Sequence, residues 1–207
     1  GGWPNRKTVD FYVRFATTVF ERYRKKVKYW MTFNEINCVK HHPYVSVGVI
    51  EENHPNLEQA KYQGAHHQFV ASALATKACH DIIPGSQVGC MISYQILYPH
   101  SCHPDDLQAC EEAQRVSLFL SDVQARGHYP EWTDRLFAAK GVVLEKAAGD
   151  DEILRQHPVD FVSLSYYMSS TISPLPEKLV DAQGNLIPGG IRNPHLPASV
   201  AGRARGP

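Results

Sequence analysis

The sequence predicts an α/β protein with a parallel sheet, and two observations carry this prediction. Helix-like and strand-like segments alternate along the chain, an order typical of parallel strands joined by helices. The strand-like segments are also almost continuously apolar, as in residues 87–93, where alternation of apolar and polar residues is missing. Continuous apolar strands are typical of sheets that are covered on both faces.

The expected helices span residues 7–24, 57–83, 104–126 and 129–139. In the first, apolar residues recur at helical spacing. The second is rich in Ala and ends at Pro84-Gly85, residues that stop helices. The third begins with Pro104-Asp105-Asp106, whose carboxylates suit the positive end of the helix dipole. Each segment therefore carries its own helix signal.

The expected strands span residues 27–33, 87–93 and 159–164. A loop with Pro43, Gly48, His54 and Pro55 follows the first strand and is too long for a simple turn. Beyond Ser170 the pattern weakens to a loop or small hairpin, and residues 198–207 have no hydrophobic periodicity. Three strands would leave long apolar edges uncovered, so the sequence resembles the middle of a larger unit.

Composition excludes several classes of partner. Lys and Arg number 21 and so do Asp and Glu, so no net field recruits nucleic acid or an anionic membrane. No apolar stretch approaches the roughly 18 residues that span a bilayer. The five cysteines form no CxxC pair and no disulfide framework, which favours free thiols and a cytoplasmic location. Because the chain begins at Gly1, an upstream signal stays open.

The residues with the most chemical content are Asn34 and Glu35, at the end of the first strand. A carboxyl group beside a carboxamide suits proton transfer to a bound sugar, and strand ends form the catalytic face of barrel enzymes. Neighbouring strand residues point to opposite faces, so the strand must bulge or unwind for both to face one ligand. A solvated Asn-Glu pair is the alternative that spacing alone leaves open.

The segment Trp30-Met31-Thr32-Phe33-Asn34-Glu35 resembles the acid/base signature of family 1 glycoside hydrolases, the β-glucosidase family. Four further segments resemble the same family in the same order: Gly1-Gly2-Trp3 with Asn5-Arg6, Ala65-His66-His67 with Val70-Ala71-Ser72-Ala73, Asp122-Val123-Gln124-Ala125-Arg126-Gly127 with Tyr129-Pro130, and Val159-Asp160-Phe161-Val162-Ser163 running to Tyr166-Tyr167. The resemblance implies a (β/α)8 TIM-barrel fragment covering roughly the fourth to sixth β/α repeats. Residues 1–194 would be the central part of one domain, and residues 195–207 a disordered or out-of-frame tail.

Three details are most similar to the bacterial 6-phospho-β-glucosidase branch: Glu35-Ile36-Asn37, Gly89-Cys90-Met91-Ile92, and residues 163–169. The resemblance implies retaining hydrolysis of a β-glycoside, with Glu35 as acid/base, without cofactor or metal. It implies that Asn34 binds the 2-hydroxyl of the sugar and that Tyr167 orients the nucleophile. Whether the glucoside is 6-phosphorylated or free stays open, as does the oligomeric state.

The sequence departs from the family at several positions. Ile36 replaces a Pro, and Ser165 replaces an Asn. The nucleophile strand, with its Glu-Asn-Gly, is missing: the only Glu-Asn is Glu52-Asn53, in a loop. For the 207-residue chain by itself, the favoured alternative is therefore an inactive remnant that at most binds sugar weakly.

Two pairs of adjacent histidines, a residue type that commonly binds metal, occur at His41-His42 and His66-His67. Adjacent helix positions diverge by about 100°, so His66 and His67 cannot both bind one ion. His41-His42 has no third ligand at a suitable spacing. We expect no metal at either pair.

Overall fold

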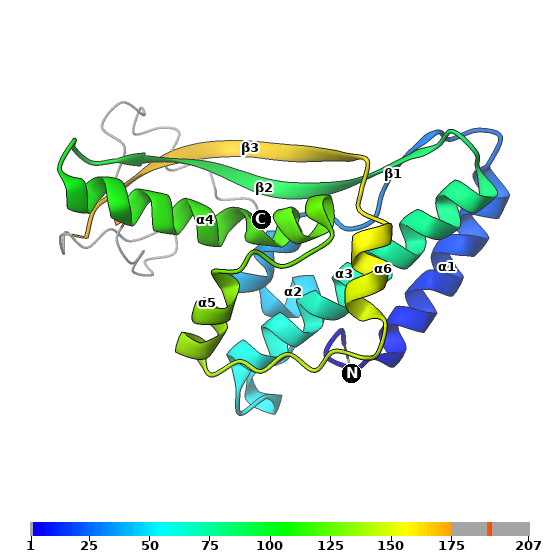
Figure 1. Ribbon diagram of the computed structural model, residues 1–207, viewed down its shortest axis with the longest axis horizontal. Coiled ribbons are helices and arrows are strands. Elements are labelled where there is room, and N and C mark those ends of the chain that lie inside the picture. The colour runs from blue at the N-terminus through cyan, green and yellow to red at the C-terminus, as the bar shows by residue number, and fades with distance from the viewer. Residues whose placement is uncertain (1, 175–189, 192–207) are drawn as a thin grey trace. The chain divides into compact units, whose positions relative to one another are not determined.

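The structure, a computed structural model, describes residues 2–174 and 190–191 (Figure 1). The chain divides into two compact units, residues 1–93 with 119–165 and residues 94–118 with 166–207. The helices are α1 (Lys7–Tyr23), α2 (Pro43–Val47), α3 (Leu57–Ile82), α4 (Pro104–Arg126), α5 (Thr133–Lys140) and α6 (Asp150–Gln156), with short 3-10 helices η1 (Ile36–Lys40) and η2 (Glu51–Asn53). The strands are β1 (Tyr29–Met31), β2 (Gln87–Pro99), β3 (Phe161–Ile172) and β4 (Gly190–Ile191), neighbours in that order.

In the first unit, β1 pairs in parallel with the beginning of β2. The two strands are joined by η1, α2, η2 and α3, as expected for a β/α repeat. Asp160 fixes the beginning of β3 to β2, because its backbone N–H donates to Val88 O and its carboxylate accepts from Val88 N, both at 2.7 Å. The parallel α/β organisation predicted from the sequence is therefore confirmed.

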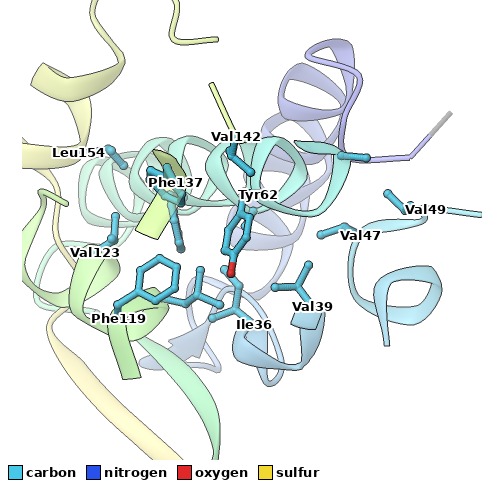
Figure 2. Packing of buried hydrophobic residues seen from close by; sticks show 14 of the residues in the cluster. Ile36, Val39, Val47, Val49, Tyr62, Phe119, Val123, Phe137, Val142 and Leu154 are labelled. Carbon is cyan, nitrogen blue, oxygen red and sulfur yellow. The ribbon is translucent and has the colours of Figure 1, made fainter. Parts of the chain in front are cut away.

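Helix α3 is the central element of the first unit, and most of its residues are buried. Helix α1 packs along it through Val9, Ala16 and Phe20 (Figure 1). On its other side Tyr62 lies 5.3 Å from the Phe137 ring and 6.0 Å from the Phe119 ring, in the core that Figure 2 shows. Side chains of this size stabilise a fold by roughly 1.5–3 kcal/mol each when they leave water.

Three sequence expectations need correction. The segment expected as a loop after the first strand contains η1, α2 and η2, because apolar side chains such as Val39 and Val47 are buried there. The first strand is shorter than residues 27–33, since the chain leaves the sheet after Met31. Helix α6 was missed, although a glycine followed by Asp150 and two further acidic residues is a usable helix start.

Several expectations are confirmed within a residue or two. Helices α1, α3 and α4 match their predicted ranges, and α5 begins a few residues later than expected. Strands β2 and β3 begin near the predicted positions, but the predicted ends at residues 93 and 164 are wrong, because β2 continues to Pro99 and β3 to Ile172. The tail expected over residues 195–207 lies outside the described residues.

The second unit contains the first part of α4, the later parts of β2 and β3, and β4. Strand β4 pairs antiparallel with β3, Thr171 opposite Ile191 and Ile172 opposite Gly190. The Asp106 carboxylate accepts hydrogen bonds from Ser101 Oγ (2.6 Å) and Ser173 Oγ (2.7 Å). These bonds lower the pKa of Asp106 and fasten the helix start to the residue after β3. In the described residues, no helix has the length and apolarity of a bilayer-spanning segment, and a cytoplasmic location stays a prediction.

Gly89 gives a first testable prediction. A Cβ atom at this position would overlap the Phe161 ring, which covers β2 there. We expect Gly89→Ala to destabilise the first unit by about 1–3 kcal/mol, because the ring must move. Urea unfolding measures the loss, and adding Phe161→Leu is expected to restore part of it. An unchanged midpoint in Gly89→Ala would contradict this packing.

Candidate active site

The site forms where the chain leaves the sheet after β1. The last ladder bond runs from Thr32 N to Gly89 O, at 3.2 Å. Glu35 then adopts the left-handed conformation, φ 45° and ψ 52°, and is the N-cap of η1. It is the only residue other than Gly with a positive φ among those described. The unwinding that the sequence analysis expected at Asn34 and Glu35 is therefore present, and left-handed backbone of this kind is concentrated at functional sites.

An aromatic cluster holds the segment just before Glu35. The Phe33 ring stacks on Tyr12, with centroids 4.7 Å apart, and meets the edge of Trp3 at 5.2 Å. Tyr12 Oη donates to Thr32 O at 2.5 Å, which occupies a carbonyl that the sheet no longer uses. Because these contacts come from the loop before α1 and from α1 itself, the first helix of the chain positions the end of β1.

Asn34 and Glu35 border a cavity of about 410 Å³ in the first unit. The other lining residues are Trp3, Phe33, Ile36, Cys38, His42, Val45, Ser46 and Gln68. Glu35 is the only carboxylate among these described lining residues, and it is half-buried. A cavity of this size holds a sugar ring, and aromatic walls with few polar groups are typical of ligand pockets. The two residues predicted to act together thus face one space.

Cys38 lies next to the carboxyl group, with its thiol Sγ 3.7 Å from Glu35 Oε2. Burial and the neighbouring Glu35 raise the pKa of this thiol to about 11. The thiol therefore stays protonated at neutral pH and donates to Oε2 of Glu35. Sequence reasoning identified Cys38 only as one of five free cysteines. Its place three residues after Glu35, on the same helical turn, was the signal available.

A buried ionic network fixes the loop that supplies Trp3. Both guanidinium NH2 groups of Arg6 donate to Asp150, at 2.6 and 2.5 Å, and His66 Nε2 lies 3.0 Å from the same carboxylate. Arg6, His66 and the Ala147 N–H outweigh burial and lower the pKa of Asp150 to about 2. Sequence reasoning did not identify Asp150, since nothing local pairs it with residues so far along the chain.

The two adjacent histidines are both used in hydrogen bonds. Burial raises the pKa of Tyr129 well above its ordinary value, so its hydroxyl keeps its proton and donates to His66 Nδ1 at 3.0 Å. His66 Nε2–H then donates to Asp150. His67 Nδ1 donates to Trp3 O at 2.7 Å, which fastens the cavity wall to α3. Both imidazole rings are therefore hydrogen-bonded to other groups of the protein. Their centroids lie 5.9 Å apart.

Two further expectations concern residues that are not among those lining this cavity. Tyr167 lies on β3 in the second unit and is exposed, so its role in orienting a nucleophile stays a prediction. Glu52 and Asn53 form part of η2, a short 3-10 helix with no buried residue. That position differs from the strand end expected for the nucleophile of the family, and the absence of the nucleophile from this chain stays a prediction.

Comparisons with known proteins identify the family of this chain. The profile of glycosyl hydrolase family 1 matches residues 1–204. The chain is 53% identical over 202 residues to the aryl-phospho-β-D-glucosidase BglH of Bacillus subtilis (strain 168), covering 98% of this chain and 43% of the relative. It is 49% identical over 199 residues to the 6-phospho-β-glucosidase AscB of Escherichia coli (strain K12), covering 96% of this chain and 42% of the relative.

Among solved structures, the virulence factor SghA from Agrobacterium tumefaciens superposes with a TM-score of 0.72 at 24% identity, over 96% of this chain and 42% of that one. A family 1 glycoside hydrolase from Thermotoga maritima gives 0.69 at 25%, over 89% and 43%. These likenesses confirm the expected fold, a partial TIM barrel. The chain spans less than half the length of the curated relatives that it matches. By profile, sequence and fold, it belongs to glycosyl hydrolase family 1.

Proposed function

We propose that this chain carries the acid/base half of a retaining hydrolase of 6-phospho-β-glucosides. The observation that carries the proposal is Glu35, lifted out of β1 into the left-handed conformation, which borders a sugar-sized cavity beside Asn34. The identity of 53% and 49% to two enzymes named for phospho-β-glucosides favours the phosphorylated substrate over the free glucoside.

The chemistry needs two carboxyl groups. In the first step the Glu35 carboxyl group donates its proton to the glycosidic oxygen as the bond from that oxygen to the anomeric carbon breaks. A second carboxylate, about 5–5.5 Å away in retaining enzymes, forms the new bond to the anomeric carbon. In the second step Glu35, now ionised, takes a proton from the water that displaces this carboxylate. Neither step calls for a cofactor.

The remaining roles are those that the resemblance to the family implies. Asn34 is exposed and borders the same cavity as Glu35, which supports binding of the 2-hydroxyl of the sugar by its carboxamide. Hydrogen bonds to that hydroxyl strengthen in the transition state. Tyr167 would orient the nucleophile from β3. The second carboxylate has to come from a segment other than these 207 residues, because the chain's one Glu-Asn pair lies in η2.

A specific observation favours the second candidate, a chain without turnover of its own. Glu35 is the single carboxylate among the described residues that border the cavity, and one carboxyl group cannot complete the double displacement. For the 207-residue chain in isolation we therefore expect sugar binding at most. The two candidates differ only in whether a second segment is supplied.

A chimera tests the proposal. The matching segment of the Bacillus subtilis relative is replaced by this chain, so that the host supplies the missing carboxylate. We expect the chimera to hydrolyse an aryl 6-phospho-β-D-glucoside, while the isolated chain at the same concentration does not. The unaltered host is the control. A chimera that unfolds cooperatively, as the host does, yet shows no turnover would contradict a catalytic role for this segment.

A further inference from the structure

Asn37 makes two hydrogen bonds to one residue of the neighbouring strand. Its Nδ2 donates to Ser93 O at 2.7 Å, and Ser93 N donates to its Oδ1 at 2.9 Å. Asn37 is 7% exposed, two residues after Glu35 on η1. A single carboxamide thus occupies both backbone groups of Ser93, which is the pattern of a peptide group in a β-ladder.

The pairing of β1 with β2 shows what these two backbone groups would otherwise bind. Gln87 N donates to Lys28 O at 2.9 Å, and Thr32 N donates to Gly89 O at 3.2 Å. In a parallel ladder, alternate residues of β2 therefore turn both backbone groups toward β1. Ser93 belongs to the same alternate set as Gln87 and Gly89.

Continuing the register for four more residues beyond the Met31–Gly89 pair would set Ser93 beside Glu35. Ser93 would then bond to the peptide groups on either side of Glu35, and Glu35 would be an ordinary strand residue. Instead the chain turns away, and the Asn37 carboxamide takes both bonds. Without a replacement of this kind, leaving the sheet would strip Ser93 of its partners.

We infer that Asn37 is a positioning residue for Glu35: its carboxamide substitutes for the strand backbone at Ser93, and so holds Glu35 out of the sheet and against the cavity. This inference rests on the proposed acid/base role of Glu35. The buried side chains of Ile36 and Val39 anchor η1 in the core, whereas Asn37 links it to Ser93 in the middle of β2.

Cys38 provides a reporter that is independent of activity. Its thiol lies 3.7 Å from Glu35 Oε2. Burial and Glu35 raise the pKa of Cys38, whereas Ser93 and Lys40 lower it, so the pKa should fall when the Glu35 carboxylate is removed or moves away. Trypsin releases Cys38 on a peptide of residues 29–40, which contains no other cysteine. Alkylation by iodoacetamide, followed on this peptide by mass spectrometry across pH, therefore gives the apparent pKa of Cys38 alone in the full 207-residue chain.

The test compares Glu35→Gln, Asn37→Leu and the double variant. Removing the carboxylate is expected to lower the apparent pKa of Cys38 by roughly one pH unit. We expect Asn37→Leu to lower it by a similar amount, because Glu35 moves away, and the double variant to show no further shift. Asn53→Leu, on the exposed η2, is the matched control and should leave the titration unchanged.

Additive shifts in the double variant would show that Asn37 only shields the thiol, and would overturn the inference. An unchanged titration in Asn37→Leu or in Glu35→Gln would do the same. Asn37→Ala serves as a second variant. Loss of the helical circular dichroism signal in both Asn37 variants would show that Asn37 stabilises the whole fold rather than the position of Glu35, and would overturn the inference. Non-additive shifts together with an inactive chimera would refute the proposed function and leave the positioning role standing.

Discussion

Glu35→Gln in the chimera is expected to lower kcat for an alkyl 6-phospho-β-glucoside by roughly 10²–10⁴-fold, the usual contribution of a general acid. An alkoxide leaves poorly without a proton, and Gln cannot donate one. With a dinitrophenyl leaving group, which departs as a stable anion, formation of the glycosyl-enzyme should be nearly unaffected. Steady-state kinetics with the two substrates, and the burst of dinitrophenol, measure this difference.

Glu52→Gln is the matched control. Glu52 is exposed, and like the nucleophile of the family it is a glutamate followed by Asn. It should leave both substrates unaffected. An equal loss of kcat/KM, which reports formation of the glycosyl-enzyme, on both substrates in Glu35→Gln would mean that the residue supports binding or folding rather than proton transfer. That outcome would contradict the role assigned to Glu35.

The second large effect concerns stability. Asp150→Asn is expected to destabilise the 207-residue chain by about 3 kcal/mol, because the carboxylate is buried and its removal leaves Arg6 and His66 without a charged partner. Urea unfolding measures the change. The control is Asp151→Asn, since Asp151 makes an exposed ion pair with Lys146 and should contribute less than about 1 kcal/mol. Equal effects of the two substitutions would contradict the network.

The same network predicts how stability depends on pH. Because the pKa of Asp150 is lowered to about 2 in the folded chain, its contribution is complete above its ordinary value near 4 and is lost as pH falls through 2. Burial lowers the pKa of His66, so the folded state favours the neutral ring and loses stability as pH falls below the ordinary histidine value of about 6.5. In Asp150→Asn the loss between pH 4 and 2 should shrink.

Local patterns predicted most of the fold of the first unit. The Ala-rich run ending at Pro84-Gly85 marks α3 within one residue, and the apolar run from Gln87 marks the beginning of β2. Both signals are strong because helix stops and continuous apolar strands depend on neighbouring residues alone. The short helices η1 and α2 escaped because a few residues carry no periodicity, and burial of Val39 and Val47 decides them.

Part of the candidate site could likewise be predicted from local sequence, and part could not. Asn34 and Glu35 could be identified from the sequence, and so could the need for the chain to unwind there. The residues that enforce this geometry could not, since Asn37 meets Ser93, and Arg6 meets Asp150, only after the chain has folded. Contacts between positions so far apart leave no mark on local spacing. The role of Tyr167 at this site stays a prediction, because Tyr167 belongs to the second unit.

The most direct test of the central claim is the product that the Glu35→Gln chimera forms from a dinitrophenyl 6-phospho-β-glucoside in the presence of azide. Azide needs no general base, so it should attack the glycosyl-enzyme and restore turnover. Two successive inversions at the anomeric carbon then give the β-glycosyl azide, which NMR identifies. That product is the predicted result. No rescue by azide, or an α-glycosyl azide, would contradict Glu35 as the acid/base of a retaining reaction.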